Sequence, residues 1–269
     1  MLTAADFQFE PPRQKIIALT NSIFLMTAGD ASFLTRVLTP LVGRVQAGVE
    51  ERPDAWLGVG DVTRWYVDEF NRQKALDAQT AVLGPFGLTT EAFLNRQATL
   101  DSDFVFRITL SLIDHPAPDC SVVIAGRDPT GTHIYSVDGT EVDQHDTIGF
   151  TAVGIGARHA LSHLMQVRHA WNSQLNDTVV RAFVAKRRSE TAPGVGRATD
   201  MVVVGEALGQ HVIVGANVLE HLDQEYEKMV AAERAAEQAA REAISAYVNG
   251  VQVNAPEQQQ ADVAAQEER

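Results

Sequence analysis

The chain has 269 residues, 45% hydrophobic and 21% charged, which is the composition of a globular protein long enough to bury a sizeable core. Its 22 Lys and Arg against 35 Asp and Glu residues give a net charge of -13, which argues against nucleic-acid binding as the main role. No apolar stretch is long enough to span a membrane, and a single cysteine excludes a disulfide framework and a cysteine-rich zinc module.

The first twelve residues lack the basic cluster and apolar run of a signal peptide. We therefore expect a cytoplasmic protein without a membrane partner.

The first third of the chain predicts a strand hairpin followed by helices. Residues 15–27 are apolar and β-rich, with turn residues at 20–22, so two short strands fit better than one helix. Asp30 or Ser32 can cap a helix over 33–46, and a second helix is expected over 59–81. Residues 104–113 suit either a helix or a strand.

The middle of the chain predicts strands and then two helices. Residues 120–126 form a buried strand, 128–131 a turn and 133–137 the returning strand. A further strand is expected over 147–153. The stretches 157–167 and 175–188 are helical, and short strands follow at 200–204 and 211–214.

The last fifty residues differ in character from the rest. Residues 222–247 are dense in Ala, Glu and Arg and predict one long exposed helix, whereas 254–269 are Gln- and Glu-rich without an apolar stripe. From Glu220 onward there are 11 acidic and 4 basic residues, so much of the acidity lies outside the core. We expect three parts: a domain at 1–218, an acidic helix at 219–250 and a disordered tail at 251–269.

Three local patterns suggest chemistry, and each has a simpler structural interpretation. Gly154-Ile155-Gly156 begins like a dinucleotide loop, but His159 stands at the third glycine position and helical sequence follows, so a tight turn is favoured. His163 follows His159 at helical spacing without the adjacent Glu of a metalloprotease helix. Cys120 is expected to pack as a small apolar residue. The sequence therefore predicts neither a cofactor nor a metal.

Six phrases in order resemble the proteasome β-type family of N-terminal-nucleophile hydrolases. They are Lys15-Ile16-Ile17, Thr27-Ala28-Gly29-Asp30-Ala31, Val123-Ile124-Ala125-Gly126-Arg127-Asp128, the stretch from Gly131 to Asp138, the stretch from Gly149 to Ala157, and the stretch from Pro193 to Met201. The resemblance covers about residues 1–214.

This resemblance implies an α+β fold, specifically a four-layer αββα sandwich with a C-terminal helical extension. It also implies assembly into a ring that hydrolyses peptides or unfolded proteins, with an ATPase as a possible partner. In the family, the hydroxyl of an N-terminal Thr attacks the peptide carbonyl and its own α-amine serves as base, because such an amine titrates near neutrality.

Carried over residue by residue, the resemblance assigns Lys15 as the lysine that supports the nucleophile and Glu190 as a further catalytic carboxylate. It places Thr3, on a turn, and Gly29 at the substrate groove. In this register the nucleophile strand and the Asp that orients the lysine lie before Met1, so we expect the fold to be incomplete at the N-terminus and this chain to be inactive alone.

The later family positions differ from the pattern. Ile155 and Pro193 each stand where the family carries serine. The alternative is therefore a catalytically inactive ring or scaffold component.

Overall fold

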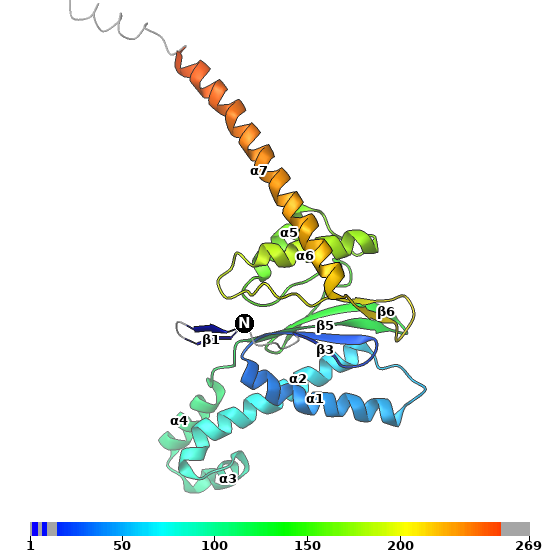
Figure 1. Cartoon of the computed structure of the whole chain (residues 1–269). Coiled ribbons are helices and arrows are strands. Elements are labelled where there is room, and N and C mark those ends of the chain that lie inside the picture. Colours follow the sequence, from blue (N-terminus) through cyan, green and yellow to red (C-terminus); the bar gives the residue numbers. More distant parts are fainter. Residues whose placement is uncertain (1, 5–6, 10–14, 254–269) are drawn as a thin grey trace, which may run out of the picture. The chain divides into compact units, whose positions relative to one another are not determined.

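The computed structural model describes residues 2–4, 7–9 and 15–253 (Figure 1). The chain divides into two compact units, Met1–Val214 and Gly215–Arg269. The boundary lies four residues before the expected end of the first domain at 218.

The first unit is organised around a five-stranded antiparallel sheet. Its strands lie side by side in the same order as along the chain: β3 (Ile16–Ala18), β4 (Ile23–Gly29), β5 (Cys120–Asp128), β6 (Gly131–Asp138) and β7 (Glu141–Gln144). The predicted hairpin at 15–27 is confirmed, and the Thr20 hydroxyl accepts the backbone N–H groups of Ser22 and Ile23 inside its turn. The strands at 120–126 and 133–137 are confirmed as parts of β5 and β6.

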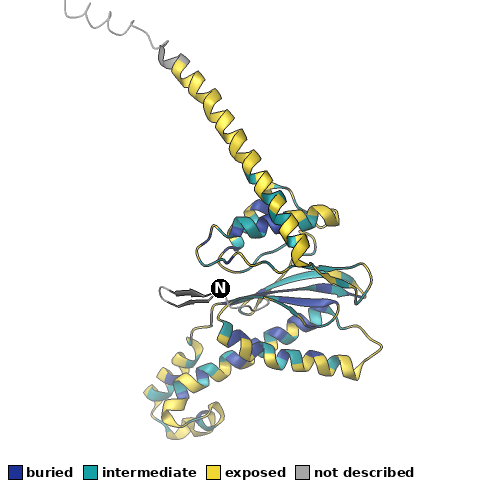
Figure 2. Ribbon diagram, in the orientation of Figure 1, coloured by how far each residue is buried: buried dark blue, intermediate teal, exposed yellow. Residues whose placement is uncertain are grey.

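Two long helices, α1 (Ala31–Glu51) and α2 (Val59–Ala78), pack on this sheet. Asp30 caps α1 by accepting the N–H groups of Ser32 and Phe33, as the sequence allowed. The sheet and both helices share one hydrophobic core (Figure 2). Its fully buried members include Leu25, Phe33, Leu41, Tyr66, Phe70, Val122, Ile124 and Val137.

A helical arm, residues 79–113, connects α2 to β5. It contains a π-helical turn (Gln79–Leu83), a 3-10 turn (Gly84–Phe86), α3 (Thr90–Arg96), a second 3-10 turn (Gln97–Thr99) and α4 (Ser102–Ile113). The stretch 104–113, whose sequence suited either a helix or a strand, is helical. The Asp101 carboxylate caps this helix by accepting the N–H groups of Asp103 and Phe104.

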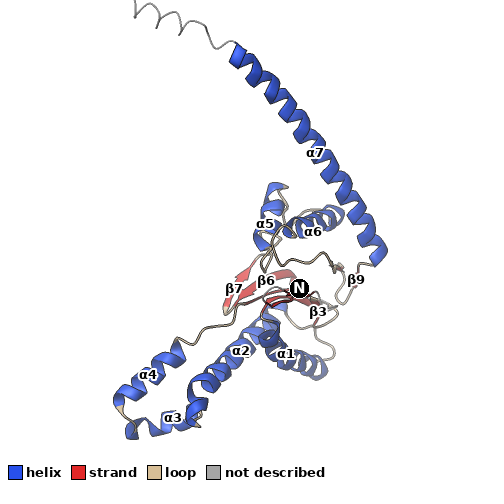
Figure 3. Ribbon diagram, turned by 60° about the vertical axis from the view of Figure 1, so that its left-hand side comes forward, coloured by secondary structure: helices blue, strands red, loops and turns tan. Residues whose placement is uncertain are grey.

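The chain after the sheet forms the remaining helices and strands of this unit. Helices α5 (Ala157–Gln166) and α6 (Leu175–Ser189) pack together and lie on the side of the sheet opposite α1 and α2 (Figures 1 and 3). Strands β8 (Val202–Val204) and β9 (His211–Ile213) pair antiparallel. The Gly209 N–H donates to the Ser22 hydroxyl at 2.6 Å, which joins this second hairpin to the turn between β3 and β4.

The expected strand at 147–153 is wrong, because residues 145–156 contain no strand. Gly149 and Gly154 both have positive φ angles, +88° and +90°, which interrupt extended backbone. A Cβ on Gly149 would lie 2.3 Å from the Trp171 backbone nitrogen, so this segment runs against the connection between α5 and α6 instead of joining a strand.

The expected α+β fold is confirmed, but the four-layer sandwich is not. The described residues form an α+β unit with one five-stranded sheet and two separate strand pairs, β8–β9 and β1–β2, the latter formed by Leu2–Ala4 and Phe7–Phe9. A second complete sheet is not present among these residues. Thr3, expected on a turn, lies inside β1 opposite Gln8.

The second unit consists of α7 (Ala216–Val253), which extends the predicted helix at both ends. Every residue from 231 to 249 is exposed, as expected for a helix rich in Ala, Glu and Arg. The predicted disordered tail at 251–269 begins too early, because residues 251–253 belong to α7, and its remainder at 254–269 lies outside the described residues. Across 2–4, 7–9 and 15–253, no helix has the combination of length and apolar character needed to cross a bilayer.

Candidate functional site

Three segments far apart in the sequence meet near the end of β4. A Cβ on Gly154 would lie 3.0 Å from the Cβ of Ala28, so the turn before α5 touches β4. A Cβ on Gly156 would lie 2.8 Å from the Cβ of Ser189 and 3.0 Å from a methyl group of Val195. These contacts define a glycine-lined junction between β4, the 154–156 turn and the end of α6. Glycine is required there because a side chain would separate the three segments.

Gly29 occupies a position that only glycine suits. Its φ angle is +103°, and a Cβ there would lie 2.0 Å from the carbonyl oxygen of Asp119. The next residue, Asp30, donates its N–H to that same oxygen at 3.0 Å. Gly29 therefore allows β4 to turn into α1 while it remains against the start of β5.

Lys15 directly precedes β3, and it is exposed. The pairing of Ile16 with Met26 places Lys15 at the open end of the hairpin, beside Thr27 in the same register. The structure thus brings Lys15 and Gly29 to the same end of the β3–β4 pair. It leaves the lysine accessible, in contrast to a structural lysine held in a buried ion pair.

Glu190, at the end of α6, is engaged by basic side chains. Its carboxylate accepts Lys186 Nζ at 2.5 Å and Arg187 Nη1 at 2.9 Å, and Arg197 Nε lies 3.8 Å away. Lys186 also donates to the Gly196 carbonyl at 2.7 Å. The Glu190 cluster therefore holds the 193–197 loop against α6, which is a positioning role for the glycine-lined junction.

The other sequence candidates show no catalytic environment. Cys120 is buried, and burial is the main reason that the pKa of its thiol is raised to about 11, so the reactive thiolate is disfavoured. His159 is exposed and His163 buried. Within the described part of the chain, no cluster of three or more His, Cys, Asp and Glu side chains could hold a metal ion.

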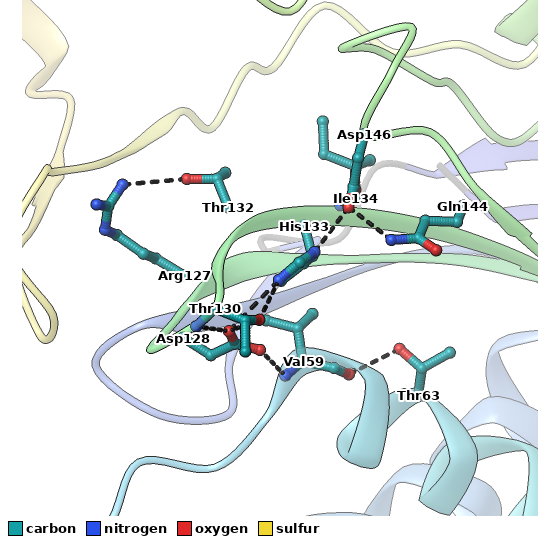
Figure 4. Close-up of polar contacts among 10 residues, drawn as sticks. All are labelled: Val59, Thr63, Arg127, Asp128, Thr130, Thr132, His133, Ile134, Gln144 and Asp146. Atoms are coloured by element: carbon teal, nitrogen blue, oxygen red, sulfur yellow. Dashed lines mark hydrogen bonds and ion pairs between the residues drawn. The ribbon is translucent and has the colours of Figure 1, made fainter.

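A second polar cluster lies at the turn between β5 and β6 (Figure 4). His133 is bonded at both ring nitrogens: Nδ1 lies 2.7 Å from the Asp146 carboxylate and Nε2 lies 2.8 Å from the Thr130 hydroxyl. The Thr130 hydroxyl donates to Asp128 at 2.5 Å, and Asp128 also accepts the Val59 N–H at 2.9 Å. We call this set, Val59, Asp128, Thr130, His133 and Asp146, the histidine clamp.

The histidine clamp has the residue types of a catalytic triad but not its hydrogen-bond pattern. A hydroxyl has one proton, and Thr130 gives it to Asp128. In a triad the hydroxyl instead gives its proton to the imidazole. The geometry therefore supports a structural role, in which the clamp connects the β5–β6 turn, the turn that contains Asp146 and the start of α2.

Both carboxyl groups of the clamp have a lowered pKa. Burial alone would raise the pKa of Asp128, but hydrogen bonds from Thr130 and Val59 and the nearby His133 outweigh it. Burial likewise opposes the shift at Asp146, whose pKa is lowered by hydrogen bonds from the Ile134 N–H, His133 and Gln144 and by the nearby His133 charge. Both groups are thus held ionised.

Sequence reasoning identified 128–131 as a turn but missed the histidine clamp. A usable signal was present, because Asp128 and His133 lie on either side of a two-residue turn that contains Thr130, which brings three polar side chains to one end of the hairpin. The sequence around the turn does not show that Asp146 and Val59 belong to the clamp, since each comes from a different part of the fold. The Glu190 partners at 186 and 187 are one helical turn away, so helical spacing alone predicts that part of its cluster.

No protein-family model matches this chain, and a search of curated proteins finds no match.

Proposed function

We propose that the chain is a subunit of a proteasome-like, N-terminal-nucleophile peptidase, and that its core is the αββα sandwich of that family. In this proposal α1 and α2 form the first layer and β3–β7 the second. The β8–β9 pair belongs to the third layer, and α5 and α6 form the fourth. The order of these elements along the chain and the two helical layers on opposite sides of the sheet support it.

One observation carries the proposal: the glycine-lined junction joins segments that the family resemblance picked out separately. Ala28 belongs to the second phrase, Gly154 and Gly156 to the fifth, and Val195 to the sixth. Residues so distant in sequence meet only if the chain folds in a particular way, and the contacts Ala28–Gly154 and Gly156–Val195 supply that convergence. Lys15 lies at the same end of the β3–β4 hairpin.

The proposed reaction is hydrolysis of a peptide bond, with the ammonium of Lys15 stabilising the deprotonated nucleophile. A compact ammonium favours a nearby anion through charge. The resemblance puts the attacking hydroxyl and its amine outside the residues that the structure describes. The accessible position of Lys15 is compatible with a further segment placed against it.

The test is peptidase activity measured with a panel of fluorogenic peptides. Two proteins are compared, the chain as printed and a version extended upstream in frame from its gene. We expect activity only in the extended version, and loss of about 10²–10⁴ in rate in its Lys15→Ala variant. Lys15→Arg should also fail, because a planar guanidinium does not replace a compact ammonium. Lys228→Ala, which removes an exposed lysine from α7, is the matched control. Near-normal turnover of Lys15→Arg would refute the assignment.

The second candidate function is a catalytically inactive ring or scaffold component. Two observations favour it: Ile155, where the family carries serine, is 74% exposed, and Glu190 is occupied by basic side chains. Light scattering separates the candidates when combined with the peptidase assay. A discrete large oligomer in which neither version hydrolyses any peptide would establish the scaffold and reject the peptidase.

A further inference from the structure

The helical arm at 79–113 exposes an apolar stripe on α4. Phe106, Leu110 and Ile113 follow one another at helical spacing, and their exposed fractions are 62%, 42% and 70%. The opposite face of the helix is already used, since Ile108 is buried with Phe93 in the arm's own small core. Helix α4 is therefore apolar on two faces, and the fold of the arm covers only one. Adjacent exposed apolar side chains of this size mark an interaction surface.

Charged residues border this stripe along one side. Asp103 and Arg107 form an exposed ion pair at 2.9 Å, and Asp114 follows at the end of the helix. All three lie on the same flank, because positions 103, 107 and 114 repeat at helical spacing. The flank thus reads negative, positive, negative from its start to its end.

We propose that the α4 stripe binds the α4 stripe of a second copy of this chain, with the two helices antiparallel and Leu110 at the two-fold axis. This arrangement packs Leu110 on Leu110 of the second copy and Phe106 near its Ile113. The stripe is thus complementary to itself, as a two-fold interface requires. The inference does not depend on the proposed peptidase function.

The charges on the flank select the antiparallel orientation. With Leu110 at the centre, Arg107 of one copy lies beside Asp114 of the other, and the two-fold axis repeats this pair. A two-fold parallel arrangement would instead place the charged flanks of the two copies on opposite sides of the interface, so Arg107 and Asp114 could not pair between copies. The two ion pairs therefore favour the antiparallel arrangement and fix its register.

A disulfide test follows from the two-fold axis, since only a residue on the axis meets its own copy. Leu110→Cys should form a disulfide-linked dimer with oxidised glutathione, seen on a non-reducing gel. The wild-type chain is a suitable background because its one cysteine, Cys120, is buried. Ser111→Cys is the matched control, because Ser111 is exposed on the same helix but points away from the stripe. Equal crosslinking of both variants would overturn the proposal.

The reversible association is tested by light scattering across a range of concentrations. Leu110→Glu should lower the molar mass while Ser111→Glu leaves it unchanged, with the melting temperature of both near that of the wild type. Arg107→Asp and Asp114→Arg should each weaken association about tenfold, and the double variant should restore it. A wild-type chain that shows no concentration-dependent association, or a molar mass unaffected by Leu110→Glu, would overturn the proposal.

Discussion

The central core and the helical arm at 79–113 differ in how completely their apolar side chains are covered. The central core buries sixteen residues between the sheet and helices α1 and α2, whereas three arm residues, Leu83, Phe93 and Ile108, are buried. Each region contains an amphipathic helix with an Asp cap, α1 with Asp30 and α4 with Asp101. The sheet makes the difference, because it offers α1 and α2 a broad apolar surface and no sheet lies against α4 in the described residues. The comparison teaches that a helix with two apolar faces needs a second partner.

The largest expected effect contrasts two phenylalanines, one in each region. Phe70 is fully buried and makes an edge-to-face contact with Phe33, with ring centroids 5.2 Å apart. Phe70→Ala should lower the free energy of unfolding by about 3–5 kcal/mol, since it leaves a cavity in a closed core. Phe106→Ala should change it by less than about 0.5 kcal/mol, because that ring is mostly exposed.

Urea unfolding of both variants, at a protein concentration low enough to suppress association, measures the contrast. Similar losses of unfolding free energy in the two variants would show that the arm is packed as tightly as the central core, contrary to the difference described above.

The next effect concerns a glycine at the end of β4 and one inside α1. Gly29→Ala should destabilise the fold by about 3 kcal/mol, because the positive φ angle strains any side chain and the new Cβ would overlap the Asp119 carbonyl. Gly43→Ala should be neutral or stabilising by about 0.5–1 kcal/mol, because a Cβ there has no neighbour within 4 Å and alanine favours a helix. Thermal melts of the pair decide whether Gly29 is required for its backbone geometry. A harmless Gly29→Ala would instead show that the turn from β4 into α1 does not require glycine at this position.

A smaller effect links the histidine clamp to pH. The folded-state pKa of Asp128 and of Asp146 lies below the ordinary value of 3.8, so the unfolded chain binds more protons than the folded one near that pH. The stabilisation is therefore fully present above about pH 4 and is lost as the pH falls through the lowered values. His133→Ala should cost about 2 kcal/mol at neutral pH and flatten this acid dependence, because it removes a hydrogen-bond partner of Asp146 and a neighbour that lowers the pKa of both carboxyl groups.

Unfolding curves of wild type and His133→Ala between pH 2 and pH 7 would measure this. His145→Ala is the control, since His145 bonds the neutral Ser136 hydroxyl at 2.7 Å. An unchanged acid slope in His133→Ala would show that the clamp is not the source of the pH dependence.

The fold could be predicted where local signals were sufficient. The turn residues at 20–22 and the cap at Asp30 each act over four or fewer residues, and the elements beside them were predicted correctly. The strand at 147–153 was not, because apolar alternation does not show whether a partner strand exists, and Gly149 is needed for a contact with Trp171 far along the chain. For the same reason the histidine clamp was missed. Its turn is local, but Asp146 and Val59 reach it only in the folded chain.

The smallest effect compares two helix caps of the same chemistry. Asp30 and Asp101 each accept two backbone N–H groups at the start of a helix, α1 and α4, respectively. Their replacement by alanine should cost about 1 kcal/mol in either helix. Because α1 belongs to the central core, Asp30→Ala should lower the global free energy of unfolding. Because α4 is covered on one face only, Asp101→Ala should act locally, speeding amide hydrogen exchange in the arm while leaving exchange in β5 unchanged. If each variant instead changed amide exchange in the arm and in β5 by the same factor, the two regions would unfold as one unit. They would then differ only in how much of their apolar surface is buried.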